Sequence, residues 1–182
     1  MNIRPATLDD PEGLARVHVD TWRAAYRGIV PDATLDGLSY ARRAEQWREI
    51  LLRATGTAIT LVAEDDGQVV GFASAGPARM GPESYDGELW GLYVRPEYQG
   101  RGLGRQLTVA AAEWLRAVGY RSMLVLVLTD NPARAFYEHL GGRYVGEASI
   151  NIGGADLREA AYGWDDLAAW LAAEAEQGAR SA

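Results

Sequence analysis

The chain has 182 residues, 48% hydrophobic and 24% charged, which is typical of one ordinary globular domain. With a formal net charge of −7, the chain lacks the excess of basic residues that is typical of a nucleic-acid-binding protein. There is no cysteine and all 18 basic residues are arginine, which excludes disulfides, thiolate metal sites, cysteine acyl-enzymes and the lysine chemistry of P-loop and Schiff-base enzymes.

The first 75 residues predict a strand, two helices and a β-hairpin. A short strand is expected at residues 3–6, and Asp9 then begins a helix-start pattern with Pro11 in the first turn and Glu12 three places on. A second helix is expected over residues 40–53. Residues 57–64 and 68–75 flank an Asp-Asp-Gly turn and predict a hairpin.

The first helix carries His18 on a largely apolar stripe. This position favours a packed, hydrogen-bonded histidine over a catalytic one. The neighbouring Trp22 is expected to pack the same helix.

The remaining residues alternate between strands and helices. Residues 78–87, with Gly81 and Pro82, predict a loop, and strands are expected at 88–94, 123–128, 143–152 and 157–164. Helices are expected over 103–118 and 132–140, followed by a terminal helix capped by Asp165 or Asp166 and a frayed tail after Gln177. With no repeat or linker, we expect one domain over 1–182, its core ending near 164 and its terminal helix covering about 165–177.

A glycine-rich turn connects the strand at 88–94 to the following helix. Glycines allow close backbone approach, and the first N–H groups of a helix attract anions, so the turn could bind a pyrophosphate. A purely structural tight turn is the alternative. The spacing differs from the Rossmann fingerprint, because Gly100, Gly102 and Gly104 alternate.

The spacing Gln99-x-x-Gly102-x-Gly104 resembles the acetyl-CoA signature of the GNAT superfamily, and the segment Asn131–Gly141 resembles its second conserved block. The order of elements over residues 3–164 also matches. The resemblance implies an α/β fold (α+β in some schemes) with a mixed, mostly antiparallel sheet of six to seven strands flanked by helices. One departure is Gly142, where the family usually has phenylalanine; it removes one core aromatic.

The resemblance implies an N-acetyltransferase that uses acetyl-CoA and no metal. Main-chain N–H groups of the glycine turn would hold the pyrophosphate, and the strand before it would bind the pantetheine arm. The N–H of Leu92 would contact the thioester oxygen. The implied cofactor-binding residues are Leu92, Tyr93, Val94, Gln99, Gly100, Arg101, Gly102, Leu103, Gly104, Arg105 and Asn131.

Two side chains are candidates for catalysis. Tyr137 matches the family's tyrosine that protonates the departing thiolate, with packing beside Phe136 as its alternative. Glu88 could take the proton of the attacking ammonium, and a solvated edge carboxylate is equally expected there. Further candidates for the base are Glu64, Glu147 and Asp156.

The acceptor site is expected to include Tyr26 and Glu88, because residues 22–31 occupy the loop that walls the acceptor site in the family. Without cysteine, the amine would attack bound acetyl-CoA directly in a ternary complex. A small amine, an amino acid, an aminoglycoside-type antibiotic and a protein N-terminus remain open as acceptors. A non-catalytic acyl-CoA-binding or sensing module is the rival hypothesis, whereas a phosphoryl-transfer enzyme would need the missing lysine and an acidic metal cluster.

The chain has no run of about 20 apolar residues and no signal-peptide core at its start, so we expect a cytoplasmic protein without membrane or nucleic-acid partners. A homodimer through Trp170, Leu171 and the last strands, as in many relatives, is a further hypothesis.

Overall fold

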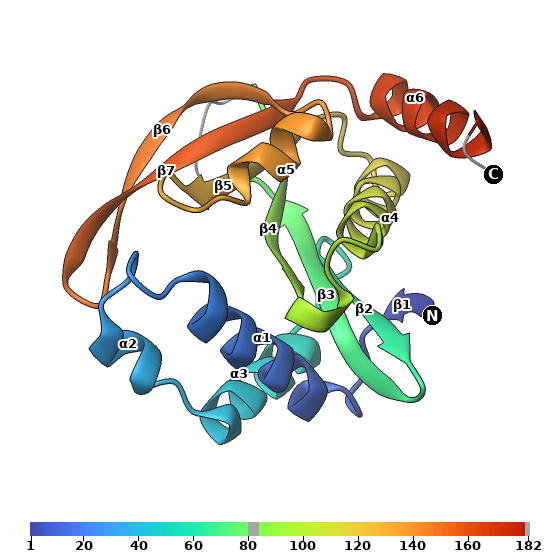
Figure 1. Ribbon diagram of the computed structural model, residues 1–182. Helices are drawn as coiled ribbons and strands as arrows, with labels where there is room; N and C mark the ends of the chain where they lie inside the picture. The colour runs from blue at the N-terminus through green and yellow to red at the C-terminus, as the bar shows by residue number, and fades with distance from the viewer. Residues whose placement is uncertain (80–83, 181–182) are drawn as a thin grey trace.

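The computed structural model describes residues 1–79 and 84–180, and its seven strands form one sheet in the order β1-β2-β3-β4-β5-β7-β6 (Figure 1). The strands are β1 (Asn2–Pro5), β2 (Ile59–Asp65), β3 (Gln68–Pro77), β4 (Gly87–Val94), β5 (Met123–Leu128), β6 (Arg143–Ile152) and β7 (Ala155–Trp164). The helices are α1 (Pro11–Ala25), α2 (Asp32–Asp36), α3 (Tyr40–Leu52), α4 (Leu103–Ala117), α5 (Arg134–His139) and α6 (Leu167–Arg180), with a 3₁₀ turn, η1 (Pro96–Tyr98). Neighbouring strands are antiparallel except β4 and β5, which confirms the expected mixed sheet.

Helices cover both faces of the central strands. α1 and α3 pack on one face, where Leu14 and Val17 lie in a buried cluster with Phe72. α4 covers the other face, where Leu107 and the buried residues one and two turns after it pack into the main core. Burial on both faces explains why β5 is apolar along its whole length rather than alternating.

The strands β4 and β5 pair only at their first residues, from Gly87 to Leu89 on β4. A bulge lies at the same place: Leu89 pairs with Ala75 on β3, Gly91 pairs with Ser74, and Trp90 is the extra residue. Because a bulge bends its strand, β4 turns away from β5 beyond this point. The later half of β4 therefore has one unpaired edge, which faces β5.

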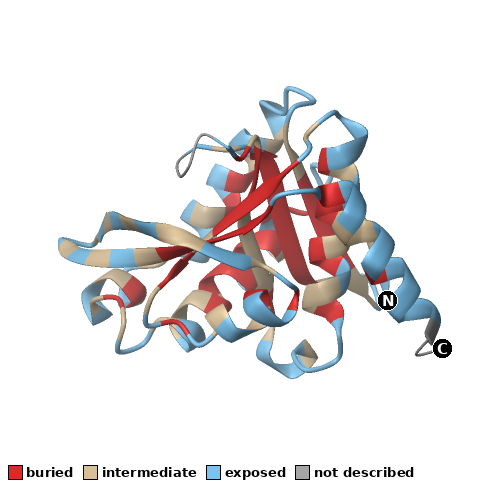
Figure 2. Ribbon diagram, turned by 90° about the horizontal axis from the view of Figure 1, so that it is seen from above, coloured by how far each residue is buried: buried red, intermediate tan, exposed pale blue. Residues whose placement is uncertain are grey.

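β6 and β7 form a long hairpin that projects from the body of the molecule (Figure 2). The inner half of β7, from Ala160 onward, is buried, whereas its outer half is partly or fully exposed. The hairpin thus extends the sheet beyond the hydrophobic core of the protein. It forms a wall above α1 and α2.

The terminal helix α6 turns its aromatic residue inward. Trp170 donates its indole N–H to the Leu140 carbonyl at 2.8 Å, and its ring lies 5.5 Å from that of Trp164. Leu171 packs on the same core. These two side chains therefore pack within their own chain and give no support to an interface. The homodimer remains a hypothesis.

Several predicted boundaries differ from the structure. The short helix α2 and the turn η1 were not predicted, because five and three residues are too short for a helical period. α5 begins at Arg134, two residues after the predicted start, and α6 continues to Arg180 beyond the predicted end. Asp166 caps α6 through the N–H of Ala169 at 3.0 Å, as expected. Gly81 and Pro82 of the predicted loop lie outside the described residues.

The predicted start of α1 at Asp9 is wrong by one residue. Asp10 occupies the N-cap position, but its carboxylate does not bond to the first-turn N–H groups. It accepts the N–H of Thr7 at 2.7 Å and binds the Arg4 guanidinium at 2.8 and 2.9 Å. The carboxylate thus fixes the connection between β1 and α1 rather than the helix end.

His18 is buried among aromatic rings, as expected, with the rings of Tyr93 at 5.1 Å and Trp22 at 5.5 Å. The predicted hydrogen bond is absent: among the described residues, neither ring nitrogen has a partner. Burial, and then the charge of Arg43, lower the pKa of His18 from 6.5 to about 3. His18 is therefore a neutral packing residue at physiological pH.

The double glycine of the second motif leaves space for a tryptophan. A Cβ atom at Gly142 would lie 3.0 Å from the Trp164 ring and 2.9 Å from the Tyr137 carbonyl. Trp164 also donates its indole N–H to Leu140 at 3.0 Å. The space beside position 142 is thus occupied by a ring from β7.

Candidate functional site

The glycine turn forms an open cradle at the start of α4. Gly100 and Gly102 have φ angles of +70° and +79°, and Gly102 is the N-cap of the 15-residue helix. Apart from the adjacent residues in the chain, no atom of the described residues lies within 4 Å of a Cβ built on Gly100, and only Gln106 approaches one built on Gly102, at 3.9 Å. The exposed backbone and the helix N-terminus together suit an anionic group.

The other residues of the turn use their side chains elsewhere. A Cβ at Gly104 would meet the Phe136 ring at 3.3 Å, so this glycine allows α4 to pack closely against α5. The Leu103 side chain is buried in the core, and Arg105 forms an ion pair with Glu174 at 2.6 Å. Leu103 and Arg105 can therefore contribute main-chain groups to a ligand, while their side chains are engaged within the fold.

Gln99 ties the turn to the end of β4. Its Nε2 donates to the main-chain oxygen of Val94 at 2.8 Å. The N–H of Arg95 points the opposite way and donates to Val70 on β3. Because N–H directions alternate along a strand, the main-chain groups of Val94 and Leu92 face the open side toward β5.

Four predicted residues meet beside this open edge: Tyr26, Tyr93, Asn131 and Tyr137. Tyr93 accepts the indole N–H of Trp22 at 3.1 Å, and the Tyr26 ring lies 4.9 Å from that of Trp22. Trp22 is therefore more than a packing residue. Burial, and then the neighbouring Tyr93 and Tyr137, raise the pKa of Tyr26. Asn131 accepts the N–H of Ala133 at 2.9 Å, which fixes the turn before α5.

The Tyr137 ring is buried, and its hydroxyl makes no hydrogen bond within the described part of the chain. Burial, and then the neighbouring Tyr93, raise the pKa of Tyr137 above its ordinary value. The hydroxyl is therefore protonated at neutral pH and chemically able to donate a proton.

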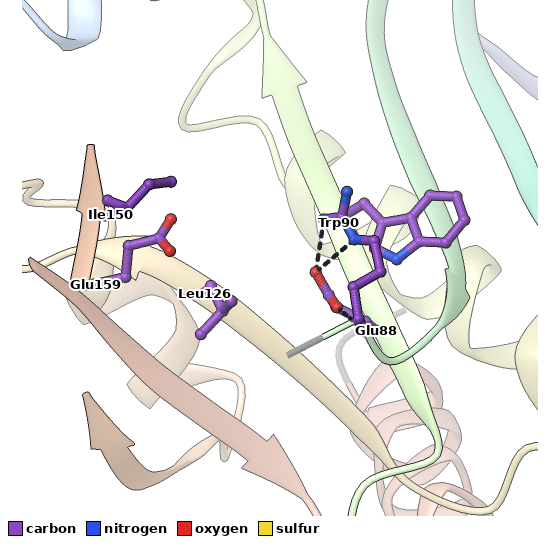
Figure 3. A pocket seen from close by; sticks show the side chains of 6 residues that line it. Glu88, Trp90, Leu126, Ile150 and Glu159 are labelled. Carbon is purple, nitrogen blue, oxygen red and sulfur yellow. Dashed lines mark hydrogen bonds and ion pairs between the residues drawn. The ribbon is translucent and has the colours of Figure 1, made fainter. Parts of the chain in front are cut away.

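Glu88 lines a pocket of about 290 Å³ on β4, just before the bulge. Its carboxylate accepts the N–H of Arg79 at 2.7 Å and the Arg79 guanidinium at 2.7 Å (Figure 3). Only 1% of the residue is exposed. The alternative of a solvated edge carboxylate is therefore wrong.

The other three carboxylates that the sequence offered are engaged outside this pocket. Glu64 pairs with Arg4 and Glu147 pairs with Arg158, both at 2.6 Å. Asp156 accepts the side-chain N–H of Asn151 at 2.7 Å.

A second carboxylate, Glu159 on β7, does line the pocket and was missed. Its one signal in the sequence was a lone acid immediately before an apolar run, 160–164.

A family model described as the acetyltransferase (GNAT) family matches residues 20–142, which include the glycine turn, Glu88 and Tyr137. The chain belongs to the GNAT family of acetyltransferases. It is 39% identical over 170 residues to the N-acetyltransferase YuaI of Bacillus subtilis strain 168, named as uncharacterised, and the match covers 93% of this chain and 95% of that one.

Solved structures share the fold. The ribosomal-protein-alanine N-acetyltransferase of Brucella melitensis superposes with a TM-score of 0.69 and 27% identity, covering 90% of this chain and 99% of that one. The protein yncA of Salmonella typhimurium, solved with its cofactor acetyl-CoA, has a TM-score of 0.67 and 24% identity over 92% and 94% of the two chains. Within residues 1–79 and 84–180, no helix is long and apolar enough to cross a membrane.

Proposed function

We propose that this GNAT acetyltransferase moves the acetyl group of acetyl-CoA to a primary amine by direct attack in a ternary complex. The observation that carries the proposal is the open edge of β4, which joins two sites. The edge ends at the glycine cradle and begins at the pocket that holds Glu88. A donor lying along this edge would present its acyl group between the two.

The residues of the cradle and edge fit acetyl-CoA. Main-chain N–H groups from Gly100 to Arg105 would hold the pyrophosphate, and the main chain of Leu92 and Val94, with Asn131, would hold the pantetheine arm. Acetyl-CoA supplies an acetyl thioester as the acyl donor. The binding of acetyl-CoA by yncA supports this choice of donor. A cytoplasmic location is part of this proposal.

Three groups of the chain would then carry the chemistry. Glu88 accepts a proton from the acceptor's ammonium, directly or through water, which frees the nitrogen lone pair. The Leu92 N–H donates to the carbonyl oxygen as negative charge develops there. Tyr137 donates its phenolic proton to the sulfur that leaves. The separate positions of Glu88 and Tyr137 support different roles in acid and base catalysis.

Calorimetry and a thiol-release assay test the proposal. Acetyl-CoA should bind and raise the melting temperature, while ATP and NAD should not. Free thiol should appear when a primary amine is added. Binding without release of thiol for any amine would favour the acyl-CoA-sensing module, and no binding would overturn the proposal.

A further inference from the structure

The pocket beside Glu88 places two carboxylates opposite each other. Glu88 and Trp90 come from β4, while Glu159 comes from β7 on the other side (Figure 3). Leu126 of β5 and Ile150 of β6 complete the wall. With about 290 Å³, the pocket is at the small end of the range for small-molecule sites.

The charges in this pocket do not balance. Arg79 neutralises Glu88 at 2.7 Å and lies with its guanidinium carbon 4.9 Å from the centre of the Trp90 ring. Glu159 forms no ion pair or hydrogen bond through its side chain with any described residue. Burial, and then the charge of Glu88, raise the pKa of Glu159, and the charge of Arg79 lowers it. The described lining holds two carboxylates and one guanidinium, which is paired with Glu88, so an ionised Glu159 has no cation of its own.

The rest of the lining is apolar. Leu126, Ile150 and the Trp90 ring offer no hydrogen-bond donor to a carboxylate or phosphate within the pocket, since the Trp90 N–H is already bonded to the Pro77 carbonyl at 3.1 Å. Among the described residues that line the pocket, the one cation is Arg79, and it is paired with Glu88. A ligand with an acidic group would meet Glu159 without a free partner for its own charge.

We infer that the acceptor is a small apolar primary amine with one positive charge and no carboxylate, and that Glu159 positions its ammonium group. An ammonium between the two carboxylates would neutralise Glu159 and stand within reach of Glu88, while its hydrocarbon part covers Leu126, Ile150 and Trp90. Glu159 is in this account a positioning residue, and Glu88 remains the base. The inference rests on the proposed amine acetylation.

Matched pairs of acceptors test the substrate class. The amine 3-methylbutylamine is leucine without its carboxylate, and hexylamine is 1,5-diaminopentane with a methyl in place of one ammonium. Each monoamine should have a kcat/KM at least ~10-fold above its partner, the cost of one unmatched charge. Leucine or the diamine reacting as well as its monoamine would overturn the inference. A peptide with an amidated C-terminus that reacts faster than 3-methylbutylamine would also overturn the inference.

A variant tests the role of Glu159, with Glu147→Gln as control because Glu147 lies on the same hairpin with its carboxylate paired to Arg158. Glu159→Gln should raise the KM for 3-methylbutylamine ~10-fold. Its kcat and its KM for acetyl-CoA should stay within about twofold, and Glu147→Gln should change none of these constants. A KM for the amine that is unchanged, or a loss confined to kcat, would overturn the positioning role.

Further measurements distinguish a folding defect, a failure of the proposed function and a failure of the acceptor class. If Glu159→Gln does not fold, judged by its melting temperature, Glu159→Asp is measured, and it should raise the same KM because the shorter carboxylate reaches less far into the pocket. If no amine at all is acetylated, the proposed function fails. If amines are acetylated but leucine competes equally, only the acceptor class fails.

Discussion

The Gln99 side chain donates a hydrogen bond of 2.8 Å to the main-chain oxygen of Val94, so the glycine turn is fastened to the strand whose edge is open. This bond fixes the position of the glycine cradle relative to the unpaired edge of β4. This relation is what a long ligand with an anionic end and an extended arm requires.

Removing this fastening should weaken cofactor binding more than folding. Gln99→Ala loses one hydrogen bond of ~1 kcal/mol, so the free energy of unfolding should fall by about that amount. The Kd for acetyl-CoA should rise ~10-fold, because the loosened turn must be ordered on binding. Calorimetry measures the affinity and urea unfolding the stability. Gln46→Ala, at an exposed position of α3, is the control; equal affinities of the two variants would contradict the prediction.

The Tyr137 hydroxyl should matter for turnover and not for affinity. Tyr137→Phe keeps the buried ring, so acetyl-CoA should bind as before, while kcat should fall by ~100-fold, the lower end of general-acid effects. The control is Tyr144→Phe, because that ring is half exposed on β6. Full kcat in Tyr137→Phe, with chemistry rate-limiting, would make the tyrosine a packing residue.

The buried His18 should make the protein sensitive to mild acid. The unfolded chain takes up the histidine proton near pH 6.5, whereas the folded chain does so only near pH 3, so stability falls as pH drops between these values. The slope should be ~1.4 kcal/mol of unfolding free energy per pH unit below pH 6.5.

Urea unfolding of His18→Leu between pH 7 and 5 checks this slope. The variant lacks the titrating group, so its stability should decline less than that of the wild type over the same interval. His139→Gln removes the other, exposed histidine and should keep the wild-type slope. Parallel curves for wild type and His18→Leu would show that His18 titrates normally in the folded chain.

The sequence predicted the parts of the molecule that depend on local pattern. The β4-turn-α4 segment was recognisable because glycine at Gly100 and Gly102 is required by positive φ angles. Gly104 looked equivalent in the sequence, yet it serves the contact with Phe136, which only tertiary packing determines. A substitution such as Gly104→Val would therefore perturb folding as well as binding.

The acceptor pocket was harder to predict from the sequence. Glu88 could be proposed because it lies on the recognised strand, but its partner Arg79 precedes it by nine residues in an irregular segment. Glu159 comes close to Glu88 only through the order in which β4, β5 and β7 lie side by side. Such long-range neighbours have no periodic signal, so the second carboxylate and the balance of charge in the pocket emerge from the fold.

The central claim is that Glu88 removes a proton from an amine that attacks acetyl-CoA, and the pH profile of Glu88→Gln tests it most directly. Thiol release would be followed with 3-methylbutylamine, or the best amine found, from pH 6 to 10. The variant should lose ~100-fold in kcat/KM at neutral pH, and this loss should shrink as pH rises, because free amine needs no base. A loss that is constant over the whole pH range, or no loss at all, would contradict the account.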